Sequence, residues 1–179
     1  METTVSSVVE EEVLRRLRDD VEGKGLELYP FKVGWYNSKV QKPFFFPYHE
    51  DTLGVCVVSS PSMFEKLFLP HLDQHHYAPG QDPLDQCLRE EMNRLASLFP
   101  NYQVEVIQDY ELLPSRRPKV LVQTVGHVAG AAYYYQRTDV DPQPWNEKSK
   151  IFGVSVHPNY GGWFALRGVL LFHGVLAPA

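Results

Sequence analysis

The sequence predicts an α+β fold in which an antiparallel sheet is flanked by helices. Three observations lead to this expectation. Two long segments, residues 7–22 and 82–98, repeat apolar side chains at helical spacing. Three shorter segments, residues 26–36, 54–59 and 102–107, have the composition or the alternation of strands. A turn of Pro, Asn and paired Gly near residues 158–162 separates two further apolar segments and predicts a hairpin.

The two long helices have recognisable beginnings or ends. In the first helix an apolar face recurs every four residues, and two glycines follow it, Gly23 and Gly25. Its glutamates at 10–12 precede its arginines at 15, 16 and 18, as the helix dipole favours. Asp82 and Pro83 begin the second helix. Its apolar stripe is formed by Leu84, Leu88, Met92 and Leu95. Ser60 and Pro61 open a third, short helix.

The strands are expected from three kinds of pattern. Residues 26–36 form a strand interrupted by Pro30, and residues 54–59 form a short buried strand rich in valine. Residues 102–107 alternate between apolar and polar side chains, which predicts a half-buried strand. Residues 119–126 fit a strand or a helix equally well. Residues 151–156 and 163–172 are the two strands of the expected hairpin.

Composition limits the class of protein. The chain has 179 residues, of which 44% are hydrophobic and 22% charged, and its formal net charge is −5. These values predict one globular domain without the basic face that nucleic-acid binding needs. Cys56 and Cys87 are too few for a disulfide scaffold, and both are expected to be buried free thiols. No signal peptide and no membrane-spanning run is evident, so the expected location is the cytoplasm.

Three loops offer groups for binding, and each has a simpler explanation. Residues 44–46 are consecutive phenylalanines, which we expect to fill the core rather than to line a ligand site. His71, His75 and His76 lie in a predicted loop, residues 70–81, without a nearby carboxylate or cysteine pattern. We therefore expect no metal site there. Arg116, Arg117 and Lys119 are either a solvated loop, which we favour, or an anion site.

The segment of residues 126–137 combines small residues with aromatic ones. Gly126, Gly130 and neighbouring alanines would let a flat ligand approach the backbone, and the tyrosines at 133–135 supply rigid contact area. The alternative is a buried turn of small residues followed by an edge strand. If the segment is extended from residue 133, Tyr134 and Gln136 share one face. The other face holds Tyr133 and Tyr135, which an amphipathic strand would turn toward the core.

Several ordered segments resemble a known family. They are residues 29–31 with 35–37, 82–87, 114–119, 127–137 and 161–168, and they run from the first strand almost to the end of the chain. These segments are similar to the cobalamin-processing proteins of the cblC type. The resemblance implies a nitroreductase-like, flavin-reductase-related fold. It also implies a single cobalamin-binding domain, residues 1–179, that lacks the helical segment with which members of the family continue.

The resemblance implies an enzyme with two activities on one substrate. Cobalamin is bound base-off, without its lower axial ligand. A cyanocobalamin reductase activity removes cyanide with electrons from reduced FAD or FMN, and an alkylcobalamin:glutathione alkyltransferase activity removes alkyl groups with glutathione as co-substrate. It further implies a cobalamin-trafficking partner of the cblD type and a monomer or ligand-induced homodimer. The alternative function is a non-catalytic cobalamin chaperone or partner-binding module.

Site residues follow from the resemblance one position at a time. His127 is expected to bind the displaced nucleotide tail rather than cobalt, because Val125 stands where cobalt-ligating enzymes carry an orienting aspartate. A core histidine bonded to backbone is the alternative. The other expected cobalamin-binding residues are Gly130, Tyr134, Gln136, Gly161 and Gly162. No residue is expected to bind a metal ion.

Two residues are expected to take part in catalysis. The amide of Gln136 can bond corrin amides or water above cobalt. Arg167 is expected to bind a carboxylate of glutathione, since an unpaired buried guanidinium is costly. The alternative for Arg167 is an ion pair with an acidic side chain of this chain.

Overall fold

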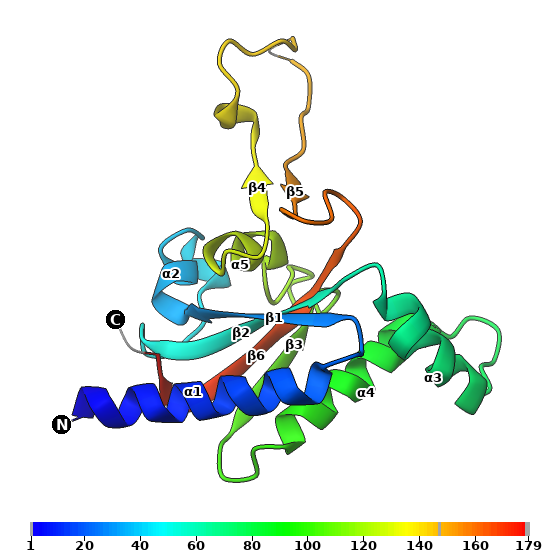
Figure 1. Cartoon of the computed structure of the whole chain (residues 1–179). Helices are drawn as coiled ribbons and strands as arrows, with labels where there is room; N and C mark the ends of the chain where they lie inside the picture. The colour runs from blue at the N-terminus through cyan, green and yellow to red at the C-terminus, as the bar shows by residue number, and fades with distance from the viewer. Residues whose placement is uncertain (1, 147, 178–179) are drawn as a thin grey trace.

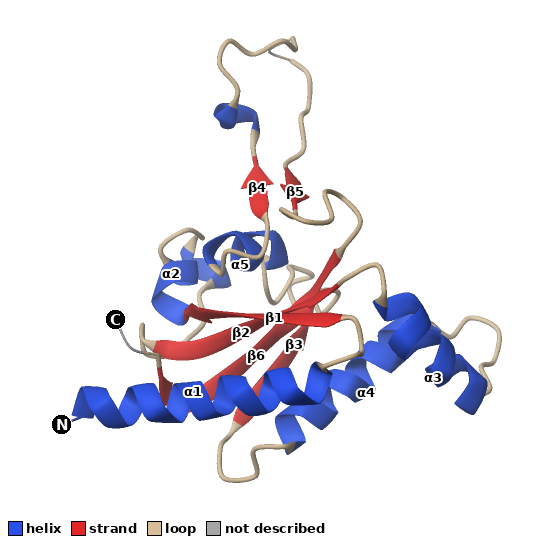
Figure 2. Cartoon of the chain, in the orientation of Figure 1, coloured by secondary structure: helices blue, strands red, loops and turns tan. Residues whose placement is uncertain are grey.

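A four-stranded antiparallel sheet lies at the centre of the molecule, with helices on both faces (Figure 1). The computed structural model describes residues 2–146 and 148–177. The strands β1 (Leu26–Lys32), β2 (Thr52–Ser59), β6 (Ala165–Leu176) and β3 (Val104–Gln108) lie side by side in that order. The expected α+β class is therefore confirmed, and Figure 2 shows the separation of helical layers from the sheet.

Both faces of the sheet are covered, which explains why β2 is apolar along its whole length. All eight of its residues are buried. Along β6, Leu170 and Phe172 belong to one core cluster, and Val169 and Leu171 belong to the other. This alternation is the ordinary two-residue period of a strand. Pro30 lies in β1, at the edge of the sheet, where proline is tolerated within a strand.

One face packs against α1 (Glu2–Val21) and α4 (Pro83–Ser97). Both helices were expected, although α1 begins earlier than its pattern indicates. The carboxylate of Asp82 caps α4 by accepting from the backbone N–H groups of Leu84 and Asp85, each at 3.0 Å. An ionic network joins the two helices, with Asp20 and Lys24 on one side and Glu91 and Arg94 on the other.

The other face packs against α2 (Val33–Asn37) and α5 (Val122–Val128). The expected strand of residues 26–36 is thus too long, because the chain turns into α2 after Lys32, where the Gly34 N–H donates to Glu50 O at 2.7 Å. The ambiguous segment of residues 119–126 contains the start of α5. Phe46 stacks on buried Tyr36 with ring centroids 4.5 Å apart, so the core-filling explanation holds for it, whereas Phe45 is exposed.

A second, two-stranded sheet forms an arm that projects from the body (Figure 1). Its strands are β4 (Tyr133–Tyr135) and β5 (Val154–Val156), joined through the short 3₁₀ helix η3 (Arg137–Asp139). The expected hairpin of residues 151–156 and 163–172 is therefore wrong. Residues 154–156 pair with β4, and β6 pairs with β2 and β3. The turn closes locally instead, through reciprocal backbone bonds between His157 and Gly161 at 2.8 and 2.9 Å.

The segment between β2 and α4 is more helical than expected. A π-helical turn, η2 (Phe64–Phe68), runs into α3 (Leu69–Gln74), so the loop expected over residues 70–81 is wrong for its first part. A 3₁₀ turn, η1 (Lys42–Phe44), lies in the loop after α2. Among the residues that the structure describes, no helix has the length and apolar character that crossing a bilayer requires.

Candidate functional site

The loop of residues 157–164, between the arm and the central sheet, contributes to three separate cavities. The largest, about 640 Å³, includes Tyr160, and a second, about 370 Å³, includes Pro158. A third, about 420 Å³, includes Gly162 and the two aromatic residues after it. A fourth cavity of about 180 Å³ adjoins the second, since both are lined by His127 and Tyr133. We name these four by a lining residue: the Glu27, His127, Arg167 and Gln136 cavities.

The His127 cavity lies where α5 meets the arm. Gly130 turns the chain after α5 with a φ of +74°, and its N–H donates to His127 O at 3.1 Å. The Nδ1 atom of His127 accepts from the Tyr134 backbone N–H at 3.2 Å, so Nε2 carries the proton. The ring of Tyr133 meets this imidazole edge to face, with centroids 4.8 Å apart. One imidazole nitrogen is therefore held by backbone, as the core alternative required, while the half-buried ring still lines two cavities.

Gly126 has a packing role rather than a role in ligand approach. A methyl group at this position would lie 2.7 Å from a methyl carbon of Leu166 in β6. The absence of a side chain thus lets α5 lie close to the sheet. A methyl group at Gly130 would meet nothing within 4 Å, so only Gly130 fits the expectation of an open approach to the backbone.

The Gln136 cavity brings together three of the predicted site residues, His127, Tyr134 and Gln136. The backbone N–H of Gln136 donates to Asp139 Oδ2 at 2.7 Å, which fixes the start of the 3₁₀ turn. Tyr133 and Tyr135 lie on the other face and are 48% and 47% exposed, so the alternative of an amphipathic strand with a tyrosine face in the core is wrong. That face lines the His127 cavity and presents aromatic surface to a ligand.

Arg167 lies at a β-bulge. Val57 of β2 pairs with Gly168 and Val58 pairs with Leu166, so Arg167 is the extra residue of β6. Gly168 permits the bulge, because its φ is +143° and a methyl group there would lie 2.2 Å from the carbonyl oxygen of Ile107. Bulges redirect side chains, and here the Arg167 side chain lines the cavity named after it.

Few groups of the protein compensate the positive charge of the Arg167 guanidinium. Its Nε donates to Ser59 Oγ at 2.8 Å. Burial lowers its pKa, and the more distant charges of Asp109 and Asp85 oppose this shift. Within residues 2–146 and 148–177, no carboxylate lies within ion-pair distance of Arg167, which argues against the alternative of a structural ion pair.

The walls of the Arg167 cavity are mainly apolar. They come from η2, α4 and the loop before β6, and include Phe64, Phe68, Leu84, Trp163 and Phe164. Trp163 is 83% exposed, which is unusual for so large a side chain. Of the two predicted loop glycines, Gly162 lines this cavity, and Gly161 instead forms the turn with a φ of +59°.

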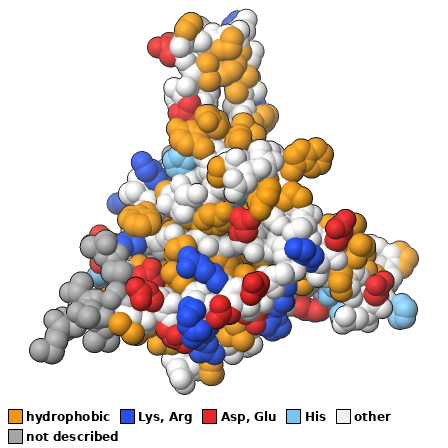
Figure 3. Space-filling view, viewed as in Figure 1, with side chains coloured by type: hydrophobic (Ala, Val, Ile, Leu, Met, Phe, Trp, Pro, Cys, Tyr) orange, Lys and Arg blue, Asp and Glu red, His pale blue; other side chains and the backbone are white. Residues whose placement is uncertain are grey.

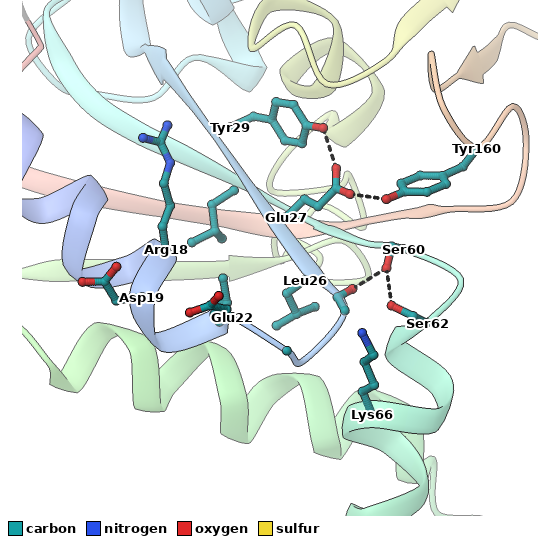
Figure 4. Close-up of a pocket in the computed structure, with 14 residues that line it drawn as sticks. Arg18, Asp19, Glu22, Leu26, Glu27, Tyr29, Ser60, Ser62, Lys66 and Tyr160 are labelled. Carbon is teal, nitrogen blue, oxygen red and sulfur yellow. Dashed lines mark hydrogen bonds between the residues drawn. The ribbon is translucent and has the colours of Figure 1, made fainter.

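The Glu27 cavity contains a partly buried hydrogen-bond network that the sequence did not suggest (Figure 4). Glu27 accepts hydrogen bonds from Tyr29 Oη at 2.6 Å and from Tyr160 Oη. The fully buried His157 accepts from the Asn159 N–H at Nδ1, at 3.1 Å, and its Nε2 lies 3.0 Å from Tyr29 Oη. One signal in the sequence could have indicated this network, namely that Glu27 lies between two leucines at the start of a strand. A strand covered on both faces rarely carries an isolated charge.

The predicted site residues therefore fall into two groups on either side of the 157–164 loop. His127, Gly130, Tyr134 and Gln136 lie at the base of the arm, and Gly162 and Arg167 lie just before and within the first residues of β6. The basic cluster of residues 116–119 contributes to neither group, and Lys119 pairs with Glu111.

Comparison with known proteins gives one consistent family. Residues 25–179 match the model of the methylmalonic aciduria and homocystinuria type C family. Relatives named cyanocobalamin reductase / alkylcobalamin dealkylase include a chicken protein, 52% identical over 95% of this chain and 71% of its own length, and a zebrafish protein, 51% identical over 98% and 70%. The human relative of the same name is 45% identical over 93% of this chain and 59% of its own length.

A solved structure agrees with these matches. The crystal structure of a Caenorhabditis elegans B12-trafficking protein, CblC, described as a human MMACHC homologue, superposes with a TM-score of 0.79 at 32% identity. The superposition covers 94% of this chain and 72% of that chain. This likeness is consistent with the nitroreductase-like fold that the family resemblance implied.

Proposed function

Because the chain belongs to the methylmalonic aciduria and homocystinuria type C family, we propose that it processes cobalamin as a cyanocobalamin reductase and alkylcobalamin dealkylase. The observation that carries this proposal is the identity of about half of all positions to relatives of that name over nearly the whole chain. A corrinoid is too large for any one of the cavities and needs an extended surface. The cavities on both sides of the 157–164 loop together offer such a surface, which supports the proposal.

The base of the arm is the proposed cobalamin site. The nucleotide tail, released from cobalt in the base-off form, enters the His127 cavity, where the imidazole and exposed tyrosines offer stacking and a hydrogen bond. Tyr134 and Gln136 face the corrin from the adjoining cavity, and the Gln136 amide bonds its side-chain amides. Gly130 and the Gly161–Gly162 turn let the ring approach the backbone. Without its lower ligand cobalt would be easier to reduce, and reduced cobalt holds an upper ligand only weakly.

The Arg167 cavity is the proposed glutathione site for dealkylation. The Arg167 guanidinium has N–H donors that are not bonded to a carboxylate of the protein. Two of these donors can form parallel hydrogen bonds to one carboxylate of glutathione. The thiolate attacks the alkyl carbon as the cobalt–carbon bond breaks. Both electrons of that bond stay on cobalt, and the products are a thioether and reduced cobalamin. The protein contributes position and exclusion of water rather than an acid or base.

Decyanation needs electrons rather than a nucleophile, and we propose reduced FAD or FMN as their source. Reduction of cobalt lets cyanide leave with its lone pair. The described cavities offer no cradle for a flavin phosphate. In the largest one Arg18 and Lys66 share the lining with the acidic residues Asp19, Glu22 and Glu27 (Figure 4). We therefore treat the flavin as a co-substrate and assign no residues to it.

The arm supports the proposal of a protein partner. Hydrophobic side chains gather along it in Figure 3, and Phe152 and Val154 are 75% and 57% exposed. We propose a cytoplasmic protein, acting as one domain of residues 1–179, that receives or passes on cobalamin through a cblD-type partner. It works as a monomer or as a ligand-induced homodimer.

A spectral titration tests the proposed function. Methylcobalamin mixed with increasing protein is expected to shift its visible absorbance to shorter wavelength, as the base-off form requires. An unchanged spectrum at saturating protein would contradict cobalamin binding. Cyanocobalamin with reduced flavin then separates an enzyme from a chaperone, because a chaperone would give the base-off shift without loss of cyanide.

A further inference from the structure

Two histidines and a glutamate converge outside the cobalamin site. His71 lies in α3, His75 ends that helix one turn later, and Glu90 projects from the neighbouring α4. One potential ligand atom from each of the three lies within 4.8 Å of the others. The sequence argument against a metal rested on the lack of a nearby carboxylate, and the fold supplies that carboxylate from a position fifteen residues beyond His75.

The hydrogen bonds of His75 leave it ready to bind a cation. Its Nδ1 lies 2.8 Å from the carbonyl oxygen of His71, and a carbonyl can only accept, so Nδ1 carries the proton. The lone pair of Nε2 therefore faces Glu90 Oε2, 4.0 Å away. His71 Nδ1 lies 3.7 Å from the same oxygen. Nitrogens of two imidazoles and one oxygen of Glu90 thus lie around a common point, which a cation could occupy.

The outer contacts hold this group in place. His71 Nε2 is hydrogen-bonded to the hydroxyl of Tyr77, which orients the ring and leaves Nδ1 pointing inward. The other oxygen of Glu90, Oε1, accepts from Gln86 Nε2 at 3.0 Å. Metal-binding imidazoles and carboxylates commonly have such second partners, which fix the tautomer and the direction of the ligand.

We propose that His71, His75 and Glu90 bind Zn²⁺, with water at a fourth position. In tetrahedral coordination with bonds of about 2.0–2.2 Å, ligand atoms lie about 3.4 Å apart. The separations of 3.7 and 4.0 Å from Glu90 exceed this value by about 0.3 and 0.6 Å. The two imidazoles are stacked with centroids 4.2 Å apart, so both rings must rotate for their nitrogens to reach one ion. Two imidazoles and one carboxylate suit zinc, and the side chain of His71 is only 10% exposed.

Such a site would fasten α3 to α4. The same part of the chain forms one wall of the Arg167 cavity, since Phe64 and Phe68 of η2 precede α3 directly and Leu84 lies on α4. The proposal stands on these contacts alone and does not depend on cobalamin processing.

Isothermal titration of the full, tag-free chain with zinc chloride at pH 7.5, without cobalamin, tests the site. We expect one Zn²⁺ per chain. Glu90→Gln and His75→Ala, both on partly exposed side chains, should each weaken binding at least tenfold. The matched control is His76→Ala, because this adjacent exposed histidine is not among the three ligands. It should bind zinc as the unmodified chain does.

Thermal unfolding gives a second readout on the same proteins. Excess Zn²⁺ should raise the Tm of the unmodified chain and of His76→Ala, and should leave the Tm of the two ligand variants unchanged. No binding at 100 µM Zn²⁺, or equal affinity in Glu90→Gln, His75→Ala and the control, would overturn the proposal. The second result would place any bound zinc at other histidines.

Discussion

Replacing Arg167 by glutamine should separate the two proposed activities. The substitution removes a charged fork that faces an apolar cavity, and it keeps a polar side chain of smaller size. Hydrogen bonds to charged groups contribute about 1.5–3 kcal/mol. Their loss predicts a rise of about 10- to 150-fold in the KM for glutathione in dealkylation of methylcobalamin.

Folding should be little affected by this substitution. The lost bond from Nε to Ser59 costs about 1 kcal/mol. Relief of the buried charge, whose cost is visible in the lowered pKa of Arg167, offsets part of that loss. For a chain of this size the net change corresponds to a Tm shift of about 4 °C at most.

The assay follows methylcobalamin absorbance without oxygen at several glutathione concentrations, and cyanocobalamin with reduced flavin in parallel. Arg15→Gln serves as the matched control, because the ion pairs of Arg15 on α1 are exposed and remote from the cavity. Decyanation should stay at the wild-type rate in both variants. An unchanged glutathione dependence in Arg167→Gln would refute the assignment. Equal loss of both activities and of thermal stability would show that Arg167 is structural.

Three further predictions concern binding, acid stability and the bulge. His127→Ala should weaken base-off cobalamin binding about tenfold in the spectral titration while the folded fraction is kept; a fall in Tm with unchanged affinity would mark the histidine as structural. Arg94 lowers the pKa of Asp20 from 3.8 to about 2, so this pair stabilises the fold above pH 3.8 and the contribution is lost as pH falls toward 2. Arg94→Gln should therefore move acid unfolding, followed by circular dichroism, to higher pH, and an unmoved midpoint would count against the pair. Gly168→Ala should destabilise the chain by about 2 kcal/mol or more, since its methyl group would meet Ile107 O at 2.2 Å, whereas Gly130→Ala has open space and carries only the strain of its positive φ; equal Tm values for the two variants would contradict the role of the bulge.

Sequence patterns predicted those helices and strands whose defining residues all lie within one segment of the chain. The apolar stripe and the Asp82 cap identified α4, and the valine-rich run identified β2. Pro30 was compatible with a strand because β1 lies at the edge of the sheet. In each case the residues that make the pattern also make the decisive contacts.

Pairing between distant strands was beyond the sequence pattern. Residues 151–156 and 163–172 were expected to pair as a hairpin, yet β5 pairs with β4, and β6 pairs with β2 and β3. The bulge at Arg167 exists only in relation to β2, so alternation within one strand could not reveal it. Likewise, Glu90 meets His71 and His75 only through the packing of α3 beside α4.

The anchoring of His157 has a kinetic consequence. The ring is fully buried, and its bonds to Asn159 and Tyr29 hold the turn between arm and sheet in one shape. The conformational entropy of this turn is therefore lost during folding, and a ligand does not have to order it on arrival. Association of different corrinoids should consequently proceed at similar rates, and differences in their affinity should appear in how fast they leave.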